Sequence, residues 1–425
     1  MNSSFYHKKR KQFFDPIEDF WPDLYGEEYA LYDIYQTDRK VIKKIQLSTE
    51  RIGHIFFKTA TILRHAPDEI LTEMGFPKES LSFLRLLPVQ AESVIARLDL
   101  VQSGETFKCL ELNADTPTFI KEVYDINEHV CREFQLVNPN QGMETRLRQA
   151  LRDNLQATKR ISEESFNIVF TAHEENIEDR NTALYLQKLS GFPARFIPLH
   201  RLQIIEREGL YDEGGHRIDV LYRQTFPIEN LLLDYDSSGQ PIGRWLMELV
   251  ELGKLAIINP PSAFLLQNKS VQAVIWGLHE EMDPFFTQEE HHWIEEHFLP
   301  TYLEPDPFLQ EECPYVQKPV FGREGDTVQI YDGTGQLQLE DTYKTYQDYL
   351  PIYQKYIELP KVQYSSEKGV CQGHLIFGSF LISGQAGAIG CRVGDPITNN
   401  LSYFFPIGLR RGRDNVDPTS DFFKG

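Results

Sequence analysis

The sequence contains few cysteines, little positive charge and no long apolar run. Its five cysteines are an odd number, and no two of them have the two-residue separation typical of metal-binding or redox motifs. We therefore expect free, mostly buried thiols, as in a cytoplasmic protein. With 43 basic against 63 acidic residues, the net charge is −20, which argues against general binding to nucleic acids or anionic membranes. No apolar stretch reaches transmembrane length, so no membrane association is expected.

The composition that remains favours an enzyme-sized globular chain. The 425 residues are 41% hydrophobic, enough for a large core divided into two or three subdomains. The basic start is followed by acidic residues from Asp15 onward instead of an apolar run, so no signal peptide is expected. Apolar spacing predicts mostly helix over 16–77, with helices from Glu27 to Lys44 and from Thr49 to Leu63.

Two segments with strand-like alternation carry polar side chains on one face. The first places Arg97 and Asp99 together, and the second places Glu111 and Asn113 together. The polar run between the segments is typical of a hairpin turn. Asp99, Glu111 and Asn113 offer oxygen ligands, which suit Mg²⁺ because it takes one or two carboxylates and completes its shell with water and phosphate. An ordinary hairpin with a polar exposed face explains this segment alone equally well.

A second polar motif predicts a loop that binds phosphate. Lys318 ends a short strand, and the following loop carries Gly322 and Gly325, with Arg323 between them. Glycines let a backbone approach phosphate oxygens, successive N–H groups in such a loop form an anion nest, and the two cations add charge. The motif is neither a Walker loop nor a dinucleotide-binding turn. For this segment alone, a plain hairpin with a basic rim is the alternative.

Together and in this order, the motifs resemble those of the glutathionylspermidine synthase-like ligases. The resemblance covers nearly the whole chain and rests on Arg97-x-Asp99, Glu111-x-Asn113-Ala114-Asp115-Thr116-x-Thr118, Asn268-Lys269, Lys318-Pro319-x-x-Gly322-Arg323, Leu359-Pro360-Lys361 and Cys391-Arg392-Val393-Gly394-Asp395. It implies a mixed α/β (α+β) fold, a circularly permuted ATP-grasp with a Rossmann-like pre-ATP-grasp layer and a β-rich lid.

The resemblance also implies a division of the chain. An N-terminal helical region plus the metal-binding hairpin would occupy 1–165, and the pre-ATP-grasp layer would occupy 166–241. The ATP-grasp nucleotide-binding and lid region would follow at 242–425. No cysteine precedes Cys109, so the catalytic cysteine of the family's amidase domain has no counterpart before the hairpin. A stand-alone synthetase domain is therefore expected.

Site residues follow from the matched positions. By resemblance, Mg²⁺ would be bound by Asp99, Glu111 and Asn113, and the ATP phosphates by Lys269 and Lys318.

Further roles come from the same resemblance. Nucleotide binding would also involve Gly322, Arg323 and Leu359, the last in a hinge that reads adenine. The catalytic arginines would be Arg97, Arg323 and Arg392. The carboxylate substrate and its acyl phosphate would be held by Arg97, Thr116 and Thr118.

The amine-side residues match the family pattern poorly. Glu178 and Asp179 follow an apolar strand and align with an acidic pair that the family uses near its polyamine; a solvated helix N-terminus is the alternative. Where the family typically has a lysine and tryptophans, this chain has Arg223-Gln224-Thr225-Phe226. Together with Glu229, Arg223 and Gln224 either face the cleft or lie in a turn with satisfied polar groups.

The expected activity is ligation of a carboxylate to an amine, dependent on ATP and Mg²⁺. Phosphorylation of the carboxylate supplies phosphate as a leaving group, and attack by the amine then gives an amide, ADP and phosphate. The partners expected are small molecules, with a peptide thiol and a polyamine as first candidates; a homodimer is left open. The alternatives are a ligase of the same fold for another peptide or amino acid and amine, a glutathione synthetase relative, or a catalytically silent nucleotide-binding protein.

Overall fold

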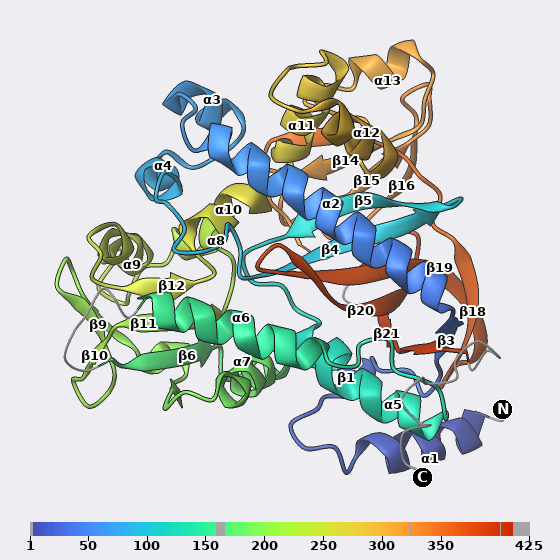
Figure 1. The fold of residues 1–425 in the computed structure, drawn as a ribbon, viewed down its shortest axis with the longest axis horizontal. Coiled ribbons are helices and arrows are strands. Elements are labelled where there is room, and N and C mark those ends of the chain that lie inside the picture. The colour runs from blue at the N-terminus through green and yellow to red at the C-terminus, as the bar shows by residue number, and fades with distance from the viewer. Residues whose placement is uncertain (1–2, 159–165, 324, 400, 411–425) are drawn as a thin grey trace, which may run out of the picture.

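A six-stranded antiparallel sheet crosses the middle of the molecule (Figure 1). The computed structural model describes residues 3–158, 166–323, 325–399 and 401–410. The strands of this central sheet lie in the order β21 (Tyr403–Phe405), β20 (Gln385–Gly394), β19 (Gly369–Ile382), β4 (Ile95–Ser103) and β5 (Thr106–Asn113), with β18 (Lys361–Ser366) paired to β19. The predicted hairpin is confirmed as β4 and β5, and it is built into a sheet with strands from the C-terminal part of the chain.

One long helix, α2 (Arg39–Leu63), crosses the face of the central sheet and contacts β5, β19 and β20 (Figure 1). Asp38 caps it by accepting a hydrogen bond from the Val41 amide at 3.0 Å. The predicted break between one helix ending at Lys44 and another beginning at Thr49 is wrong, because α2 runs through it. Thr49 lies inside α2, where its hydroxyl donates to the Ile45 carbonyl at 2.8 Å.

The predicted helix from Glu27 to Lys44 is also wrong over its first half. This region contains β1 (Asp23–Leu24), β2 (Glu27–Glu28) and β3 (Tyr35–Thr37). β3 pairs in parallel with β22 (Ile407–Leu409), and the Tyr35 ring packs edge-on against Phe405. Tyrosines three and four residues apart imitate a helical stripe, but Tyr32 packs against Phe13 and Phe134, whereas Tyr35 packs against C-terminal strands that the local sequence does not reveal.

A parallel sheet of four strands forms a second layer. Its order is β12 (Ala256–Ile258), β11 (Val220–Gln224), β6 (Ile168–Ala172) and β7 (Arg195–Phe196). In Figure 1, α6 (Met143–Thr158) and α7 (Ile177–Ser190) lie over this sheet. A small antiparallel meander of β8 (Gln203–Ile205), β9 (Gly209–Tyr211) and β10 (Arg217–Ile218) extends from it. The expected strand–helix alternation is present, and the division at 166 and 242 stays a prediction.

The third layer is an antiparallel sheet beside α11 and α12. Its strands follow the order β13 (Thr301–Tyr302), β17 (Pro351–Lys355), β14 (Tyr315–Pro319), β15 (Gln329–Tyr331) and β16 (Leu337–Glu340). The remaining helices are α1 (Ser3–Phe14), α3 (Asp68–Glu73), α4 (Leu81–Leu84), α5 (Asn127–Glu133), α8 (Ile228–Leu231), α9 (Ile242–Glu251), α10 (Pro261–Gln267), α11 (Ser270–Glu280), α12 (Gln288–His297) and α13 (Asp306–Gln310). Among the described residues, no helix is long and apolar enough to span a membrane.

The cysteines fit the expectation from the sequence. All five are free, three of them buried and two partly buried. Burial raises the pKa of Cys109 and of Cys391 far above the usual range of a thiol. These side chains therefore act as packing groups.

Glycines on β20 let the segment after the hairpin approach the central sheet. This segment enters a π-helical turn, Glu122–Ile126, which packs against β20. A Cβ at Gly390 would overlap the Val123 side chain and lie 2.6 Å from the Phe119 ring. The absence of a side chain at Gly390 thus brings the segment 119–126 close to the sheet.

We predict that Gly390→Ala lowers the free energy of unfolding by about 1–3 kcal/mol, because the added methyl group overpacks this contact. Gly277→Ala is the matched control. Its Cβ would meet no atom within 4 Å, and the residue lies inside α11. This second change should stabilise the protein by up to about 1 kcal/mol through helix propensity. Urea denaturation measures both, and equal effects of the two alanines would contradict the packing argument.

Candidate functional site

Two cavities meet at a shared wall. The first lies between the central sheet and the sheet of β14, β15 and β17, and its empty volume, with its open mouth, is about 810 Å³. The second lies between β4, β5, the segment 116–119 and the β1–β2 hairpin. Both cavities are lined by Asp99, Glu111, Arg323, Gly325 and Thr398. The structure therefore brings the predicted metal carboxylates to the junction.

Asp99 and Glu111 are directly opposite one another in the β4–β5 ladder. The ladder shifts register immediately afterwards, so that Leu100 pairs with Cys109 and Leu110 becomes an extra residue in β5. Cys109 belongs to the hydrophobic core, whereas Glu111 faces the cavities. In a regular strand these two residues would point the same way, so the bulge is what turns Glu111 to the site.

Arg97 neutralises Asp99 through a two-pronged contact. Its Nε donates to Asp99 Oδ1 at 2.7 Å and its Nη2 to Oδ2 at 3.1 Å. A third donor, Nη1, reaches the Thr118 carbonyl at 3.0 Å. Burial lowers the pKa of Arg97, but the charges of Asp99 and Glu111 outweigh it and the pKa is raised, so the guanidinium stays charged.

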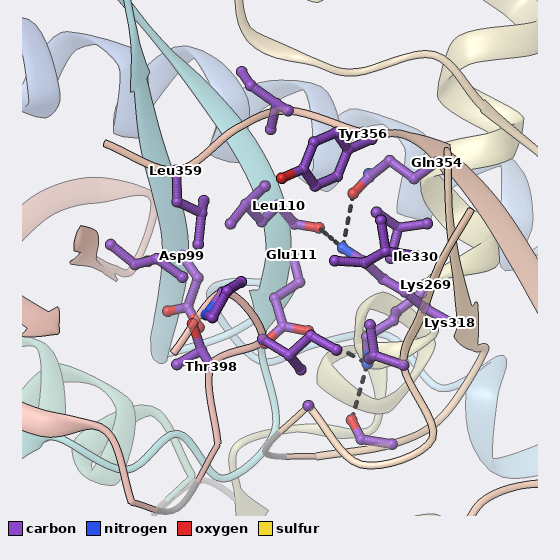
Figure 2. A pocket seen from close by; sticks show the side chains of 18 of the residues that line it. Asp99, Leu110, Glu111, Lys269, Lys318, Ile330, Gln354, Tyr356, Leu359 and Thr398 are labelled. Carbon is purple, nitrogen blue, oxygen red and sulfur yellow. Dashed lines mark hydrogen bonds and ion pairs between the residues drawn. The ribbon is translucent and has the colours of Figure 1, made fainter. Parts of the chain in front are cut away.

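Lys269 pairs with the other carboxylate, and Lys318 lies in the same cavity (Figure 2). Lys269 Nζ lies 3.4 Å from Glu111 Oε2 and donates to the Gly322 carbonyl at 2.9 Å. Lys318 Nζ donates to Gln354 Oε1 at 2.8 Å. Burial would raise the pKa of Glu111, but Lys269, Lys318 and Arg97 hold it well below its usual range. Burial lowers the pKa of Lys318 to about 8, against the opposing charge of Glu111.

Arg323 and Gly325, which follow β14, line both cavities. Gly325 has φ of +71°, and a Cβ there would collide with the Thr398 carbonyl. Arg323 reaches across the junction, where its Nη2 donates to the Thr116 carbonyl at 3.2 Å. Gly322 and Leu359 both line the first cavity. The predicted nucleotide-binding residues are thus brought together around one space, and their roles stay predictions.

The donor set at the junction fits a hard divalent cation. Asp99 and Glu111 supply carboxylate oxygens, and the Asn113 amide donates to Glu111 Oε1 at 3.2 Å, which keeps it beside the pair. Within the described ranges, no group of three His, Cys, Asp or Glu side chains could hold a metal ion. Two carboxylates with an amide match Mg²⁺, which retains water and phosphate ligands, better than a metal that needs a complete protein cage.

The remaining predicted residues separate into two groups. Thr116, Thr118, Arg392 and Glu178 line the second cavity, and the Arg392 guanidinium donates to the Asn399 carbonyl at 3.0 Å. Asp179 is buried at the start of α7, where its amide donates to the capping side chain of Asn176, and it is not among the residues that line the cavity.

The parallel sheet fixes the backbone that carries the threonines. Arg223, at the end of β11, forms an ion pair with Asp115, and both side chains are almost completely buried. Gln224 donates to the Pro117 carbonyl at 3.2 Å. Neither Arg223 nor Gln224 lines either of these two cavities. Both bond to neighbouring groups in the interior, although Arg223 Nε has no hydrogen-bond partner among the described residues, so the alternative of a turn with satisfied polar groups holds only in part. In the sequence, the available signal for a structural ion pair was an arginine at the end of an apolar strand.

Two amides complete this support. Gln267 Oε1 accepts hydrogen bonds from the Ala114 and Asp115 amides at 2.9 and 3.1 Å. Asn259 donates to the Ala114 and Asp115 carbonyls and accepts from the amide of Ile95 in β4. Neither residue stands out in the sequence, since an isolated Asn or Gln carries no pattern.

Comparison with known proteins connects this geometry to a family. The family model for the glutathionylspermidine synthase pre-ATP-grasp region matches residues 7–410. The chain belongs to this family. A relative from Haemophilus influenzae, named "Putative acid--amine ligase", is 24% identical over 334 residues and is matched over 75% of each chain. A glutathione synthetase-like effector from Globodera pallida, solved in the apo form, aligns over 89% of each chain with a TM-score of 0.55 and 13% identity.

Membership in the glutathionylspermidine synthase family accounts for the architecture. The mixed α/β fold is the circularly permuted ATP-grasp that the sequence predicts, and the Globodera pallida structure supports the fold alone. The hairpin of β4 and β5 and the segment after β14 both line the first cavity.

A buried carboxyl beside the Asp115 ion pair gives a pH-dependent prediction. Glu229 in α8 is 2% exposed, and its Oε2 has no hydrogen-bond partner among the described residues. Burial raises its pKa from 4.5 to about 7; the charge of Asp115 adds to this effect, and Arg323 and Lys269 oppose it. Between these two pH values the folded state holds more protons than the unfolded state, so stability falls as the pH rises through this window.

We predict that Glu229→Gln removes this loss. Relative to wild type, the variant should gain up to about 3 kcal/mol in free energy of unfolding between pH 4.5 and pH 8, since each pKa unit is worth about 1.4 kcal/mol. Urea denaturation at several pH values measures the difference. Glu304→Gln, at an exposed position, is the control and should follow wild type at every pH. Parallel curves for Glu229→Gln and wild type would contradict the prediction.

Proposed function

We propose that this chain is an ADP-forming carboxylate–amine ligase that uses ATP and Mg²⁺ and forms an acyl phosphate. The observation that carries the proposal is the junction, where Asp99, Glu111 and Arg323 line both cavities. A phosphoryl group that passes from a nucleotide in one cavity to a carboxylate in the other has to cross this wall. The family and the name of the Haemophilus influenzae relative support the same class of reaction.

The first cavity suits a nucleotide. Its wall combines apolar side chains such as Ile330 and Leu359, against which a base can pack, with the ammonium groups of Lys269 and Lys318. Both lysines lie at the end of the cavity that holds Glu111, so the phosphates would point to the junction. In this proposal Lys269 and Lys318 bind the phosphates, and Gly322 and Arg323 cover them.

Asp99, Glu111 and Asn113 would hold the metal. When bound, Mg²⁺ would neutralise charge on the transferred phosphate, which is its usual contribution to phosphoryl transfer. Glu111 is suited to this role because nearby cations keep its pKa low and the carboxylate ionised.

The second cavity suits the carboxylate substrate. Arg97 is fixed by Asp99 and by the Thr118 carbonyl, and Arg323 is fixed by the Thr116 carbonyl. The two guanidinium groups therefore present their remaining surface to one space without needing to reorganise. In the first step they stabilise the charge that develops as the carboxylate attacks the γ-phosphate, and Arg392 assists from β20.

The second step needs an uncharged amine. Glu178 is the acid of the second cavity that lies outside the metal pair, so it is assigned to hold the incoming ammonium and to assist its deprotonation. Exclusion of water from the junction would protect the acyl phosphate, which water otherwise hydrolyses. The amine then attacks the acyl carbon, the amide bond forms, and phosphate leaves.

Other readings of the same fold predict different outcomes. A ligase for another peptide or amino acid would show the same dependence on two substrates with a different pair, and a glutathione synthetase relative would require gamma-glutamylcysteine and glycine. A catalytically silent nucleotide-binding protein would bind ATP without forming ADP. A cytoplasmic location and a homodimer stay expectations.

ADP release from Mg-ATP, measured against a panel of carboxylates and amines with product masses read in parallel, tests the proposal. Glutathione with spermidine comes first, followed by other peptides, amino acids and amines. We expect ADP release that requires both substrates and yields an amide. We predict that Asp99→Asn lowers this turnover at least about a hundredfold, because charge stabilisation at the transferred phosphate is lost.

A control separates this effect from unfolding. Asp38→Asn makes the same substitution at the start of α2, where asparagine also caps a helix, and it should retain turnover. ADP release without any amide product, or an Asp99→Asn variant as active as wild type, would contradict the assignment.

The low pKa of Lys318 gives a further prediction. In the free protein this ammonium loses its proton near pH 8, whereas ATP phosphates would hold the charged form. Binding of Mg-ATP should therefore be about tenfold weaker at pH 9 than at pH 7. The Lys318→Met variant should bind Mg-ATP more weakly than wild type, and its affinity should not show this pH dependence. Isothermal titration calorimetry measures both, and adenosine, which lacks phosphates, is the control ligand. A wild-type affinity that is constant from pH 7 to pH 9 would contradict the role of Lys318.

A further inference from the structure

The hairpin of β1 and β2 carries a tyrosine in a conformation that tyrosine disfavours. Leu24 pairs with Glu27, so Tyr25 and Gly26 form a two-residue turn. Both have positive φ, +54° and +79°, which defines the type I′ turn that favours Asn-Gly. A bulky side chain at positive φ is strained, and this one occupies a position at which asparagine would be relaxed.

The side chain at this strained position is largely exposed. Tyr25 is 72% exposed, the highest exposure among the aromatic residues of the described chain. Nevertheless, Tyr25 and the adjacent Leu24 line the second cavity. The ring therefore stands at the mouth of that cavity with most of its surface available to a ligand.

The base of the hairpin is held firmly, so the tip has a defined place. The Arg10 side chain is 4% exposed and lies 2.8 Å from Asp23 and 3.3 Å from Glu28. Glu28 also accepts hydrogen bonds from the Tyr6 hydroxyl and the Glu367 amide. These contacts fix both strands and leave the turn projecting over the cavity.

The charges of the cavity indicate which substrate meets the ring. The guanidinium groups of Arg97, Arg323 and Arg392 suit the carboxylate, whereas Glu178 suits a cation. Tyr29, which follows the β1–β2 hairpin, lines the same cavity as Glu178. An aromatic ring and a carboxylate that line the same cavity can bind an alkylammonium together, because the π-face of the ring attracts the charge and its surface packs against the methylene chain.

We propose that Tyr25 is a specificity-determining residue for the amine substrate, an alkylammonium whose charge lies beside Glu178 and whose methylene chain packs on the Tyr25 ring. This inference rests on the proposed ligase function. It predicts that replacing Tyr25 by asparagine raises the stability of the protein and weakens binding of the amine, because asparagine relaxes the turn but removes the ring.

We predict that Tyr25→Asn raises the thermal unfolding temperature while it raises the KM for the amine about five- to tenfold. The KM values for ATP and the carboxylate should stay close to those of wild type. Tyr25→Phe keeps the ring and should retain the amine KM. The measurement is ADP release with spermidine and 1,4-diaminobutane as the amine probes, with the other two substrates saturating.

Met282→Asn is the matched control for backbone strain. Met282 follows α11, has φ of +50°, is 50% exposed and lines neither cavity. Asparagine is favoured at such a left-handed position after a helix, so this variant should also be more stable, with an unchanged amine KM. If both variants are stabilised but only Tyr25→Asn has a raised amine KM, the change in KM is due to the loss of the ring.

Hydroxylamine separates this inference from the ligase proposal, because it traps an acyl phosphate as a hydroxamate without an alkyl chain. For Tyr25→Asn, the loss of ADP-release activity with hydroxylamine should be at least about fivefold smaller than the loss of this activity with spermidine. Equal losses, an unchanged amine KM, or a shift in the carboxylate KM alone would overturn the role of Tyr25. Wild-type turnover with hydroxylamine but with neither alkylamine would also overturn it, while turnover with no nucleophile would overturn the ligase proposal itself.

Discussion

The two carboxylates that face each other across β4 and β5 impose the condition on which the rest of the site depends. Buried like charges at paired positions are stable only when cations lie close to them. Here Arg97 comes from β4 itself, Lys269 from the start of α11 and Lys318 from β14. The central sheet, a helix and a second sheet therefore meet around Asp99 and Glu111, and a local pair of charges explains why distant segments converge.

Local patterns in the sequence predicted the hairpin and the lysine loop, because both depend on strand alternation and turn residues within one short segment. The bulge also leaves a trace, since alternate positions of β5 change from apolar to polar after Cys109. The failed helix after Glu27 shows the limit of this reasoning. Its spacing is helical, but the partners that make Tyr35 part of a strand lie beyond residue 400. The pairing of buried charges such as Arg223 and Asp115 is likewise determined by tertiary packing, so a local pattern does not predict it.

The parallel sheet contributes backbone geometry to the site. Arg223 and Gln224 hold the segment 115–117, and that segment and its next residue provide the carbonyl groups that orient Arg97 and Arg323. Two arginines in the cavity wall thus depend on side chains that do not touch the cavity. This support is indirect, because the group that Arg223 and Gln224 hold is main chain.

The order of strands in the central sheet has a consequence for how the protein is made. β4 and β5 emerge from the ribosome early, but their neighbour β19 belongs to the last quarter of the chain. The Asn127 side chain likewise donates to the Ile407 carbonyl, which is synthesised 280 residues later. The edge of β4 that pairs with β19 therefore stays open throughout most of translation, exposed to mispairing and to chaperones. The parallel sheet is complete by Ile258 and can fold first, so during synthesis it is a preformed surface on which the nascent hairpin can rest.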